Sequence, residues 1–222
     1  MIVAYFECAE REYGSQVREM HWAGLEDCLL CGGADCLIGH GYYLRKPKGR
    51  IDGHDVGMVW IKRWFCKLCH GTISVLPDFL LSFRHYVVPE IQAVIEARVD
   101  GGKTWAVLEA ECAEAGAPAR RTMQRWCGSF AEQASRWLGA VQATLAQQDS
   151  RSPWLDPHGE ALAAPHLAQA LLGASEHLLA WGQTRWAEAA GYGRNDRVRF
   201  LWWWSSGRGL GGWSRGSRTH TV

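Results

Sequence analysis

Two Cys-x-x-Cys pairs constrain this 222-residue chain more than any other feature of its sequence. The pairs are Cys28–Cys31 and Cys66–Cys69, with 34 residues between them. A Cys-x-x-Cys turn presents two thiolates to one ion, and two such turns complete a tetrahedral site. The spacing therefore predicts a closed, structural site of four thiolates. We expect zinc in it, because the binding energy of the metal would help to fold a small β-ribbon.

Other interpretations of these cysteines remain open. No βαβ pattern surrounds either pair, which disfavours a redox motif, while free buried thiols and an iron site of rubredoxin type are alternatives. Cys36, His40 and His70 are possible substitute ligands. We expect Cys36 to be a bystander in the loop. Gly32 and His70 follow the second cysteine of their pairs, a position that suits a left-handed backbone.

The residues between the two pairs predict a β-ribbon. Residues 40–45 (HGYYLR) and 58–66 (MVWIKRWFC) are rich in aromatic and β-branched side chains, and residues 48–53 (KGRIDG) are typical of a turn. Seven basic residues lie in or beside these segments, and five of them carry the prediction of nucleic-acid binding. We expect them to contact the phosphates of a nucleic acid: Lys46, Lys48, Lys62, Arg63 and Lys67.

The charge of the chain is unevenly distributed, although its formal net charge is only +1. Residues 1–27 carry six acids and two arginines, a net of −4. Residues 40–70 carry seven Lys or Arg and two Asp, and residues 193–222 carry six Arg and one Asp, a net of +5 in each case. The sequence thus combines an acidic leader with two basic zones.

The N-terminus has acidic residues where a signal peptide needs a basic and then an apolar run. No window approaches the roughly 18 apolar residues of a membrane span. We therefore expect a soluble, cytoplasmic protein that has no contact with a membrane. Disulfides are rare in that compartment, which favours metal binding by the thiol pairs.

Three helices are predicted after the ribbon. The first begins near Pro89, the second has Thr104 as its N-cap, and the third begins near Pro118. One face of the third helix is apolar over many turns and predicts packing on a neighbour or on a second copy of the chain. It comprises Met123, Trp126, Cys127, Phe130, Ala134, Trp137, Leu138, Val141 and Leu145.

The first turns of the third helix predict DNA recognition. A short helix, a turn containing glycine and a helix that displays basic and polar residues form the pattern of a helix-turn-helix. The displayed residues are Arg121, Thr122, Gln124 and Arg125, and Arg136 lies on the same polar face. Arg can bind guanine and Gln can bind adenine in the major groove. A helical bundle with a solvated outer face is the alternative.

The chain is divided by its composition into an acidic leader (1–27), a zinc ribbon (28–80) and a helical region (81–148). A polar linker (149–164) and a helical C-terminal region (165–222) with a Trp-, Arg- and Gly-rich tail follow. We expect two helices around Gly173. The fold class predicted is α+β.

A catalytic centre is not predicted. The acidic residues are scattered among caps, turns and helix faces, with no pair that suits Mg²⁺ binding by a nuclease or transposase. His158-Gly159-Glu160 is similar to the H-x-E of zinc deaminases, but both Cys-x-x-Cys pairs lie upstream of it. The alternative is a shortened or split transposase whose catalytic residues lie in the C-terminal third or in a partner chain.

Several segments resemble an uncharacterised bacterial family associated with mobile elements. They are CLLCGG, HGYYLR, IKRWFCKLCHGTISVLPDFL and HYVVPEI, with RFLWWWSSGRGLG a weaker match. The same arrangement of segments is similar to the zinc-ribbon and helix-turn-helix regions at the N-terminus of insertion-sequence transposases. The resemblance spans residues 28–137, and two positions depart from it: Cys28 is not followed by Pro, and His70 replaces a small residue.

The resemblance implies a metal on Cys28, Cys31, Cys66 and Cys69, and DNA recognition by the helix that carries Arg121 and Arg125. The sequence as a whole favours a protein that binds double-stranded DNA, with structural zinc, as an accessory or regulatory factor of a transposable element. Its expected partners are a transposase or another mobile-element protein. A zinc ribbon that serves as a protein-interaction module is a further alternative.

Overall fold

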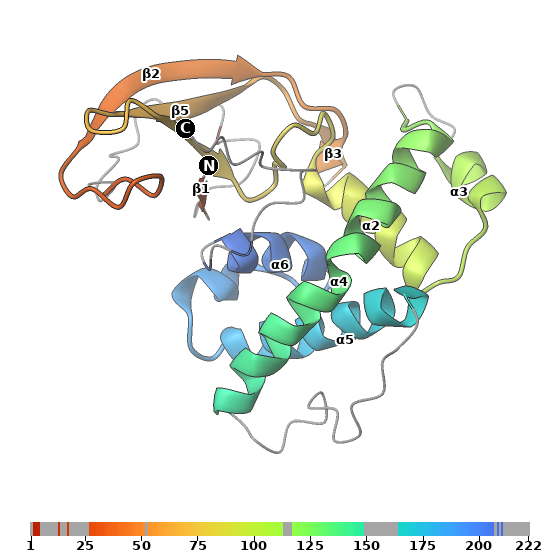
Figure 1. Cartoon of the computed structure of the whole chain (residues 1–222). Coiled ribbons are helices and arrows are strands. Elements are labelled where there is room, and N and C mark those ends of the chain that lie inside the picture. Colours follow the sequence, from red (N-terminus) through yellow and green to blue (C-terminus); the bar gives the residue numbers. More distant parts are fainter. Residues whose placement is uncertain are drawn as a thin grey trace. The chain divides into compact units, whose positions relative to one another are not determined.

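The computed structural model describes residues 2–4, 13, 17, 27–51, 53–112, 117–148, 164–206, 208 and 210 (Figure 1). They belong to two compact units, residues 1–87 and residues 88–222. The first unit holds the strands and the second holds the helices, which confirms the predicted α+β class. The predicted linker, except for Ala164, and most of the predicted leader and tail lie outside the described residues.

The N-terminal unit is built on a four-stranded sheet with the order β1-β6-β5-β2. The two long strands, β2 and β5, run side by side and antiparallel, and confirm the predicted ribbon (Figure 1). β6 pairs antiparallel with β5, and β1 pairs parallel with β6. The strands are β1 (Ile2–Ala4), β2 (Leu37–Arg45), β5 (Val59–Cys66) and β6 (Thr72–Pro77).

The connection between β2 and β5 is a small hairpin rather than a plain turn. β3 (Arg50–Ile51) pairs antiparallel with β4 (His54–Asp55). The side chain of Ile51 is buried in the core of the unit, together with Val59 and Ile61 of β5. This core also contains Tyr13 and Val17 of the predicted leader, so the leader contributes to the packing of the ribbon.

The C-terminal unit contains five α-helices in its described residues. They are α2 (Val88–Val99), α3 (Trp105–Glu111), α4 (Arg120–Gln148), α5 (Ala164–Gly182) and α6 (Arg197–Ser206), with a short 3-10 helix at Ala187–Gly191. α4 packs against α2 and α5, and α6 packs against α5 and α2 (Figure 1). Among the described helices, none has both the length and the apolar character needed to cross a membrane.

The sequence predicted the starts of α2, α3 and α4 and the buried face of α4 well. The Thr104 hydroxyl accepts a hydrogen bond from the Val107 N–H and caps α3, as predicted. Eight of the nine residues predicted on the apolar face of α4 are buried, and Cys127 is half-buried. The basic residues Arg121, Arg125 and Arg136 are exposed on the opposite side.

The predicted break at Gly173 is wrong, because α5 continues through it. One glycine inside a helix costs about 1 kcal/mol relative to alanine. The burial of Leu171, Leu172 and Leu178 along the same helix outweighs that cost. The helix ends at Gly182, where a Cβ atom would lie 2.6 Å from the ring of Trp186.

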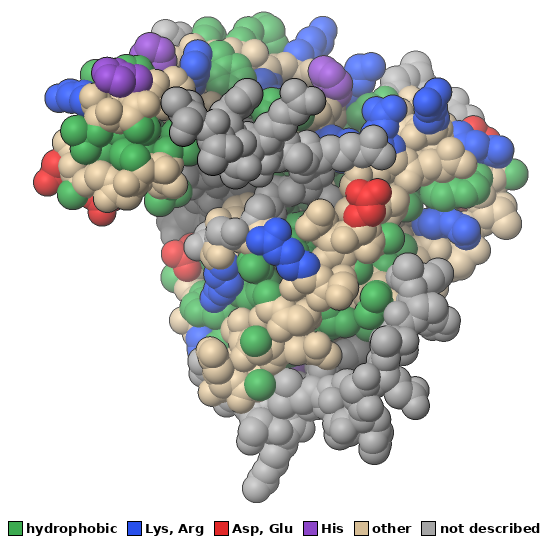
Figure 2. Space-filling model, in the orientation of Figure 1, with side chains coloured by type: hydrophobic (Ala, Val, Ile, Leu, Met, Phe, Trp, Pro, Cys, Tyr) green, Lys and Arg blue, Asp and Glu red, His purple; other side chains and the backbone are tan. Residues whose placement is uncertain are grey.

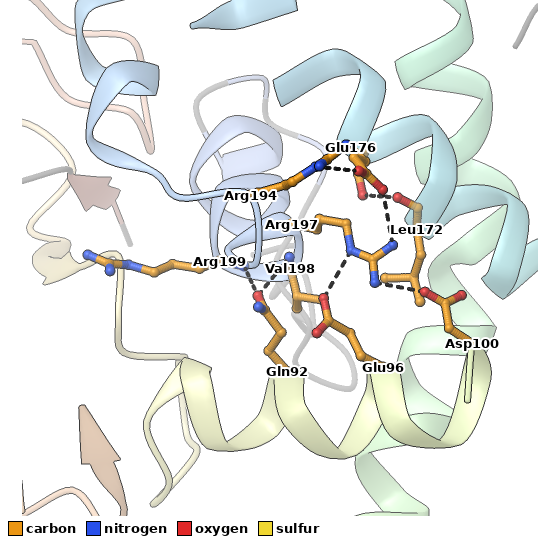
Figure 3. A network of polar contacts seen from close by, with 10 residues as sticks. Gln92, Glu96, Asp100, Leu172, Glu176, Arg194, Arg197, Val198 and Arg199 are labelled. Carbon is orange, nitrogen blue, oxygen red and sulfur yellow. Dashed lines mark hydrogen bonds and ion pairs between the residues drawn. The ribbon is translucent and has the colours of Figure 1, made fainter. Parts of the chain in front are cut away.

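α6 is attached to its neighbours by a polar network that centres on Arg197 (Figure 3). The guanidinium of Arg197 donates to Glu96 Oε1 at 3.0 Å and to Asp100 Oδ2 at 2.7 Å, and lies 3.6 Å from Glu176 Oε2. The Gln92 side-chain oxygen accepts hydrogen bonds from two backbone N–H groups in the first turn of α6. The network thus joins α6 to α2 and α5 and caps its N-terminus.

We expect Arg197→Met to lower the free energy of unfolding by about 2 kcal/mol at neutral pH, because it leaves three carboxylates without their shared cation. Burial already raises the pKa of Glu96, and Arg197 opposes that rise. Without Arg197 the pKa should rise further above its unfolded value. The stability of the variant should therefore fall as the pH increases through the carboxyl range.

Denaturant titrations at pH 4 to 7.5 would measure this effect, with Arg194→Met as the matched control. Arg194 contacts only Glu176 within the network, and its side chain is 88% exposed. We expect this control to change the stability by less than about 0.5 kcal/mol. An Arg197→Met loss that is equal at every pH would contradict the electrostatic explanation.

Candidate functional site

The first Cys-x-x-Cys turn, residues 28–33, folds into a knuckle closed by two backbone hydrogen bonds. The N–H of Gly32 donates to the carbonyl of Cys28 at 2.7 Å, and the N–H of Cys28 donates to the carbonyl of Gly33 at 2.8 Å. Gly32 has a φ of 71°, which is the left-handed region that favours glycine. We call residues 28–33 the first knuckle.

The second knuckle, residues 66–71, repeats this geometry. The N–H of His70 donates to the carbonyl of Cys66 at 3.0 Å, and the N–H of Cys66 donates to the carbonyl of Gly71 at 2.9 Å. His70 has a φ of 58° and takes the position that Gly32 has in the first knuckle. The left-handed backbone expected at both positions is therefore present. A backbone bent in this way turns two thiols toward one point.

The two knuckles interlock through leucine side chains. A Cβ atom on Gly33 would lie 2.5 Å from Leu68 Cδ1, and a Cβ atom on Gly71 would lie 2.5 Å from Leu30 Cδ1. Each knuckle therefore places a leucine over the glycine of the other knuckle. The absence of a side chain at both glycines allows this close approach.

The knuckles bring the four predicted metal ligands together. The Sγ atoms of Cys28 and Cys69 are 3.8 Å apart, and those of Cys31 and Cys66 are also 3.8 Å apart. Zinc–sulfur bonds of about 2.3 Å in a tetrahedron place neighbouring sulfurs about 3.8 Å from each other. Each of these two distances joins a cysteine of one knuckle to a cysteine of the other. Both equal the sulfur–sulfur distance of a tetrahedral thiolate site.

Cys36 belongs to the thiol cluster, although the sequence suggested that it is a bystander in the loop. Its Sγ lies 3.4 Å from Cys66 Sγ and donates to the Gly33 carbonyl at 3.0 Å. The sulfurs of Cys28, Cys31, Cys36 and Cys66 all lie within 4.8 Å of one another, a set that can hold a metal ion. The three cysteines within nine residues were the only sequence signal for this contact.

The thiols of the cluster differ widely in acidity. The backbone N–H of Cys69, with help from other hydrogen bonds, lowers the pKa of the Cys66 thiol to about 6. A hydrogen bond from the Gly71 N–H lowers the pKa of the Cys69 thiol. Burial and the neighbouring thiols outweigh this effect and raise the pKa to about 12. Burial and Cys66 raise the pKa of Cys36 to about 11. A cation would stabilise additional thiolates, and its binding would release protons.

The two histidines considered as substitute ligands are next to an aromatic ring. His40 and His70 lie 5.6 Å and 5.9 Å from the ring centroid of Phe65. Within the described residues, the only group of Cys, His, Asp and Glu side chains that could hold a metal consists of cysteines alone. The candidate metal site is therefore a cluster of thiols, which agrees with the predicted ligand class.

Three of the five basic residues predicted to contact phosphates lie against aromatic rings. The Lys62 ammonium lies 4.6 Å from the Tyr42 ring centroid and 5.2 Å from that of Trp64. Lys48 lies over Tyr86 and Arg63 over Tyr43, at 5.7 Å and 5.9 Å. Lys46 and Lys67 are exposed. Cation–π contacts restrain three of the five side chains while their polar ends can still donate hydrogen bonds.

The first turns of α4 present the residues that the sequence predicts for DNA recognition. Arg121, Gln124 and Arg125 are exposed, and Thr122 is half-buried. Arg120 instead pairs with Glu109 of α3 at 2.6 Å. Figure 2 shows Lys and Arg side chains over the end of the helical unit where α3 and the start of α4 lie. This end of the unit is therefore basic.

The described carboxylates that converge in the helical unit do so around a cation of the chain itself. Glu96, Asp100 and Glu176 surround the guanidinium of Arg197. Their negative charge is therefore neutralised by an internal ion pair. The arrangement fits a structural role in holding α6.

Residues 28–126 match the family model described as a domain of unknown function, DUF6431. The match covers less than half of the chain. It includes both knuckles, the strands β2 to β6 and the helices as far as the exposed start of α4. No curated protein and no solved structure matches the chain.

Proposed function

We propose that this protein binds double-stranded DNA through the first turns of α4, with a zinc ion that folds its N-terminal ribbon. One observation carries the proposal: Arg121, Gln124 and Arg125 project from the start of a helix whose opposite face is buried. Arg121 and Arg125 make no ion pair with the carboxylates of the described residues. Their donors are available to a ligand.

The arrangement of these residues suits the major groove. Arg121 and Arg125 are about one helical turn apart, and Gln124, three residues after Arg121, lies on the same side of α4. Arg can form two hydrogen bonds with guanine, and Gln can form two with adenine. The capped helix α3 and the helix α2, which packs on α4, supply the remaining parts of a helix-turn-helix.

The metal proposed for the thiol cluster is zinc in a structural role. Four thiolates favour soft or borderline cations, and a closed tetrahedral set leaves no position for a substrate. Cys28, Cys31, Cys66 and Cys69 hold the ion in this proposal. The ribbon then contributes DNA contacts that do not depend on base sequence, through phosphate binding by Lys46, Lys48, Lys62, Arg63 and Lys67.

The biological setting that we propose is a mobile genetic element. The segments around the knuckles and at the start of α2 resemble proteins that accompany such elements. In this setting the protein would act in the cytoplasm as an accessory or regulatory factor. Its partners would be the ends of the element and a transposase or another protein of that element, with a second copy of the chain as a further candidate.

A second candidate function is suggested by apolar side chains on the knuckles. Leu29, Leu30 and Leu68 are 68%, 57% and 63% exposed. Exposed apolar side chains that cluster together often mark a protein-interaction site. In this version, the zinc ribbon would bind a protein partner through its knuckles. The two functions are compatible, because Arg121, Gln124 and Arg125 of α4 lie outside the knuckles that carry these leucines.

Selection from a library of randomised DNA duplexes tests the proposed DNA recognition. The full chain, purified with its metal, would be mixed with the library, and the bound duplexes would be sequenced over several rounds. We expect enrichment of a short motif that contains guanine and adenine at neighbouring positions. Bound duplexes with no common motif, or an absence of bound duplex at low salt, would overturn base recognition by α4.

A further inference from the structure

The thiol cluster has one more sulfur than a tetrahedral ion needs. Cys28, Cys31, Cys66 and Cys69 form one set of four, with distances of 3.8 Å across the knuckles. Cys28, Cys31 and Cys66 form a second set with Cys36, in which all sulfurs lie within 4.8 Å of one another. The two sets share three cysteines and differ only in the fourth sulfur.

The backbone fixes Cys36 beside the second knuckle. The N–H of Lys67 donates to the Cys36 carbonyl at 2.9 Å, and the next residue, Leu37, pairs with Cys66 in the register of β2 and β5. The Cys36 thiol also donates to Gly33 of the first knuckle. Both knuckles therefore hold this thiol at the edge of the metal site, and no large movement is needed to bring it to the ion.

The two candidates for the fourth position differ in exposure. Cys69 is exposed, whereas only 4% of Cys36 is exposed. A reagent in solution can reach the outer thiol, but the inner one is protected by the ribbon. Cys31 is exposed as well but belongs to both sets, so Cys69 is the exposed thiol that has a neighbouring substitute.

We propose that Cys36 is an exchangeable fifth ligand, which binds the metal when Cys69 is released. The inference rests on the proposed zinc site. In the exchange, the Cys36 thiol loses its proton to solvent and its sulfur binds the ion, while the Cys69 sulfur leaves the ion and takes up a proton. The charge of the site and the number of thiolates on the metal do not change. Cys28, Cys31 and Cys66 keep the ion in place throughout.

The exchange requires only a small adjustment. Tetrahedral coordination needs sulfurs about 3.8 Å apart. The sulfurs of the second set are at most 4.8 Å apart, which is about 1 Å more. A rotation of the Cys36 side chain is enough to remove such a difference. The ribbon would thus keep its metal and its fold after alkylation or oxidation of Cys69.

Cobalt binding to four forms of the full chain tests this proposal: wild type, Cys36→Ser, Cys69→Ser and the double variant. The visible spectrum of bound Co²⁺ distinguishes four thiolates from three. We expect the four-thiolate spectrum and one ion per chain in the wild type and in both single variants. The double variant should show the three-thiolate spectrum and a Co²⁺ affinity at least about a hundredfold below that of Cys69→Ser.

A three-thiolate spectrum for Cys69→Ser, equal to that of the double variant, would overturn the exchange while leaving the proposed metal site intact. A wild type that binds no metal would instead overturn the metal site itself. Alkylation of the wild type by iodoacetamide supplies a second measurement on unmutated protein. Peptide mapping should find Cys69 modified in chains that still hold zinc, and loss of zinc in step with Cys69 modification in chains whose Cys31 is intact would contradict the proposal.

Discussion

Replacing Cys66 by Ser should abolish metal binding and unfold the N-terminal unit. Cys66 is common to both sets of four thiols, is fully buried, and lies where β5 ends and the second knuckle begins. Structural zinc in small domains contributes on the order of 10 kcal/mol of apparent binding free energy at neutral pH, and most of this would be lost. Cys36 does not replace Cys66, because the set of mutually close sulfurs that contains Cys36 does not contain Cys69, so only three close sulfurs remain in either set.

The helical unit should survive this substitution, because it has its own core. Far-UV circular dichroism should retain the helical signal, while hydrogen exchange should become fast in β2, β5 and β6 and zinc analysis should find no ion. Cys112→Ser is the control, since Cys112 is half-buried at the end of α3 and lies outside the thiol cluster. Full zinc content and protected strands in Cys66→Ser would contradict the structural role of the metal.

Replacing both Arg121 and Arg125 by Ala should lower the affinity for duplex DNA about a hundredfold. Each good contact between Arg and guanine contributes about 1 to 3 kcal/mol, and a factor of ten corresponds to about 1.4 kcal/mol. Both side chains are exposed, so the substitution should leave the fold intact. Fluorescence anisotropy with a duplex that contains the selected motif would measure the loss, and the discrimination between motif and random duplex should decrease in parallel.

The matched control removes the same charge from another part of the helical unit. Arg185 lies over the ring of Trp181, and Arg194 pairs with Glu176. We expect Arg185→Ala combined with Arg194→Ala to change the affinity by less than about threefold, the effect of a general change in charge. Equal losses of affinity in the two double variants would mean that Arg121 and Arg125 act only through their charge. That result would contradict base recognition by α4.

Local patterns in the sequence predicted the parts of the fold that local chemistry determines. The Cys-x-x-Cys spacing indicated both knuckles, and the residue after each pair indicated the left-handed backbone that Gly32 and His70 adopt. The aromatic and β-branched segments predicted β2 and β5. The apolar period of α4 predicted its buried face, because a long amphipathic helix repeats the same signal over many turns.

The parts that were missed depend on contacts between distant residues. The parallel pairing of Ile2–Ala4 with β6 joins residues that are more than 70 positions apart, and an acidic leader gives no sign of it. The contact between Cys36 and Cys66 follows from the register of β2 and β5, which the spacing of cysteines does not give. The ion pairs of Arg197 with Glu96 and Asp100 likewise require the packing of α6 on α2.

The affinity of the zinc-loaded wild type for duplex DNA, measured over a range of salt concentrations, tests the central claim most directly. The five basic residues of the ribbon are the proposed contacts to phosphates, and the two arginines of α4 are the proposed contacts to bases. If those five residues neutralise phosphates, the plot of log K against log[salt] should be a straight line with a slope of about −4.5. A flat plot, with no measurable binding at low salt, would contradict the proposal that this protein binds DNA.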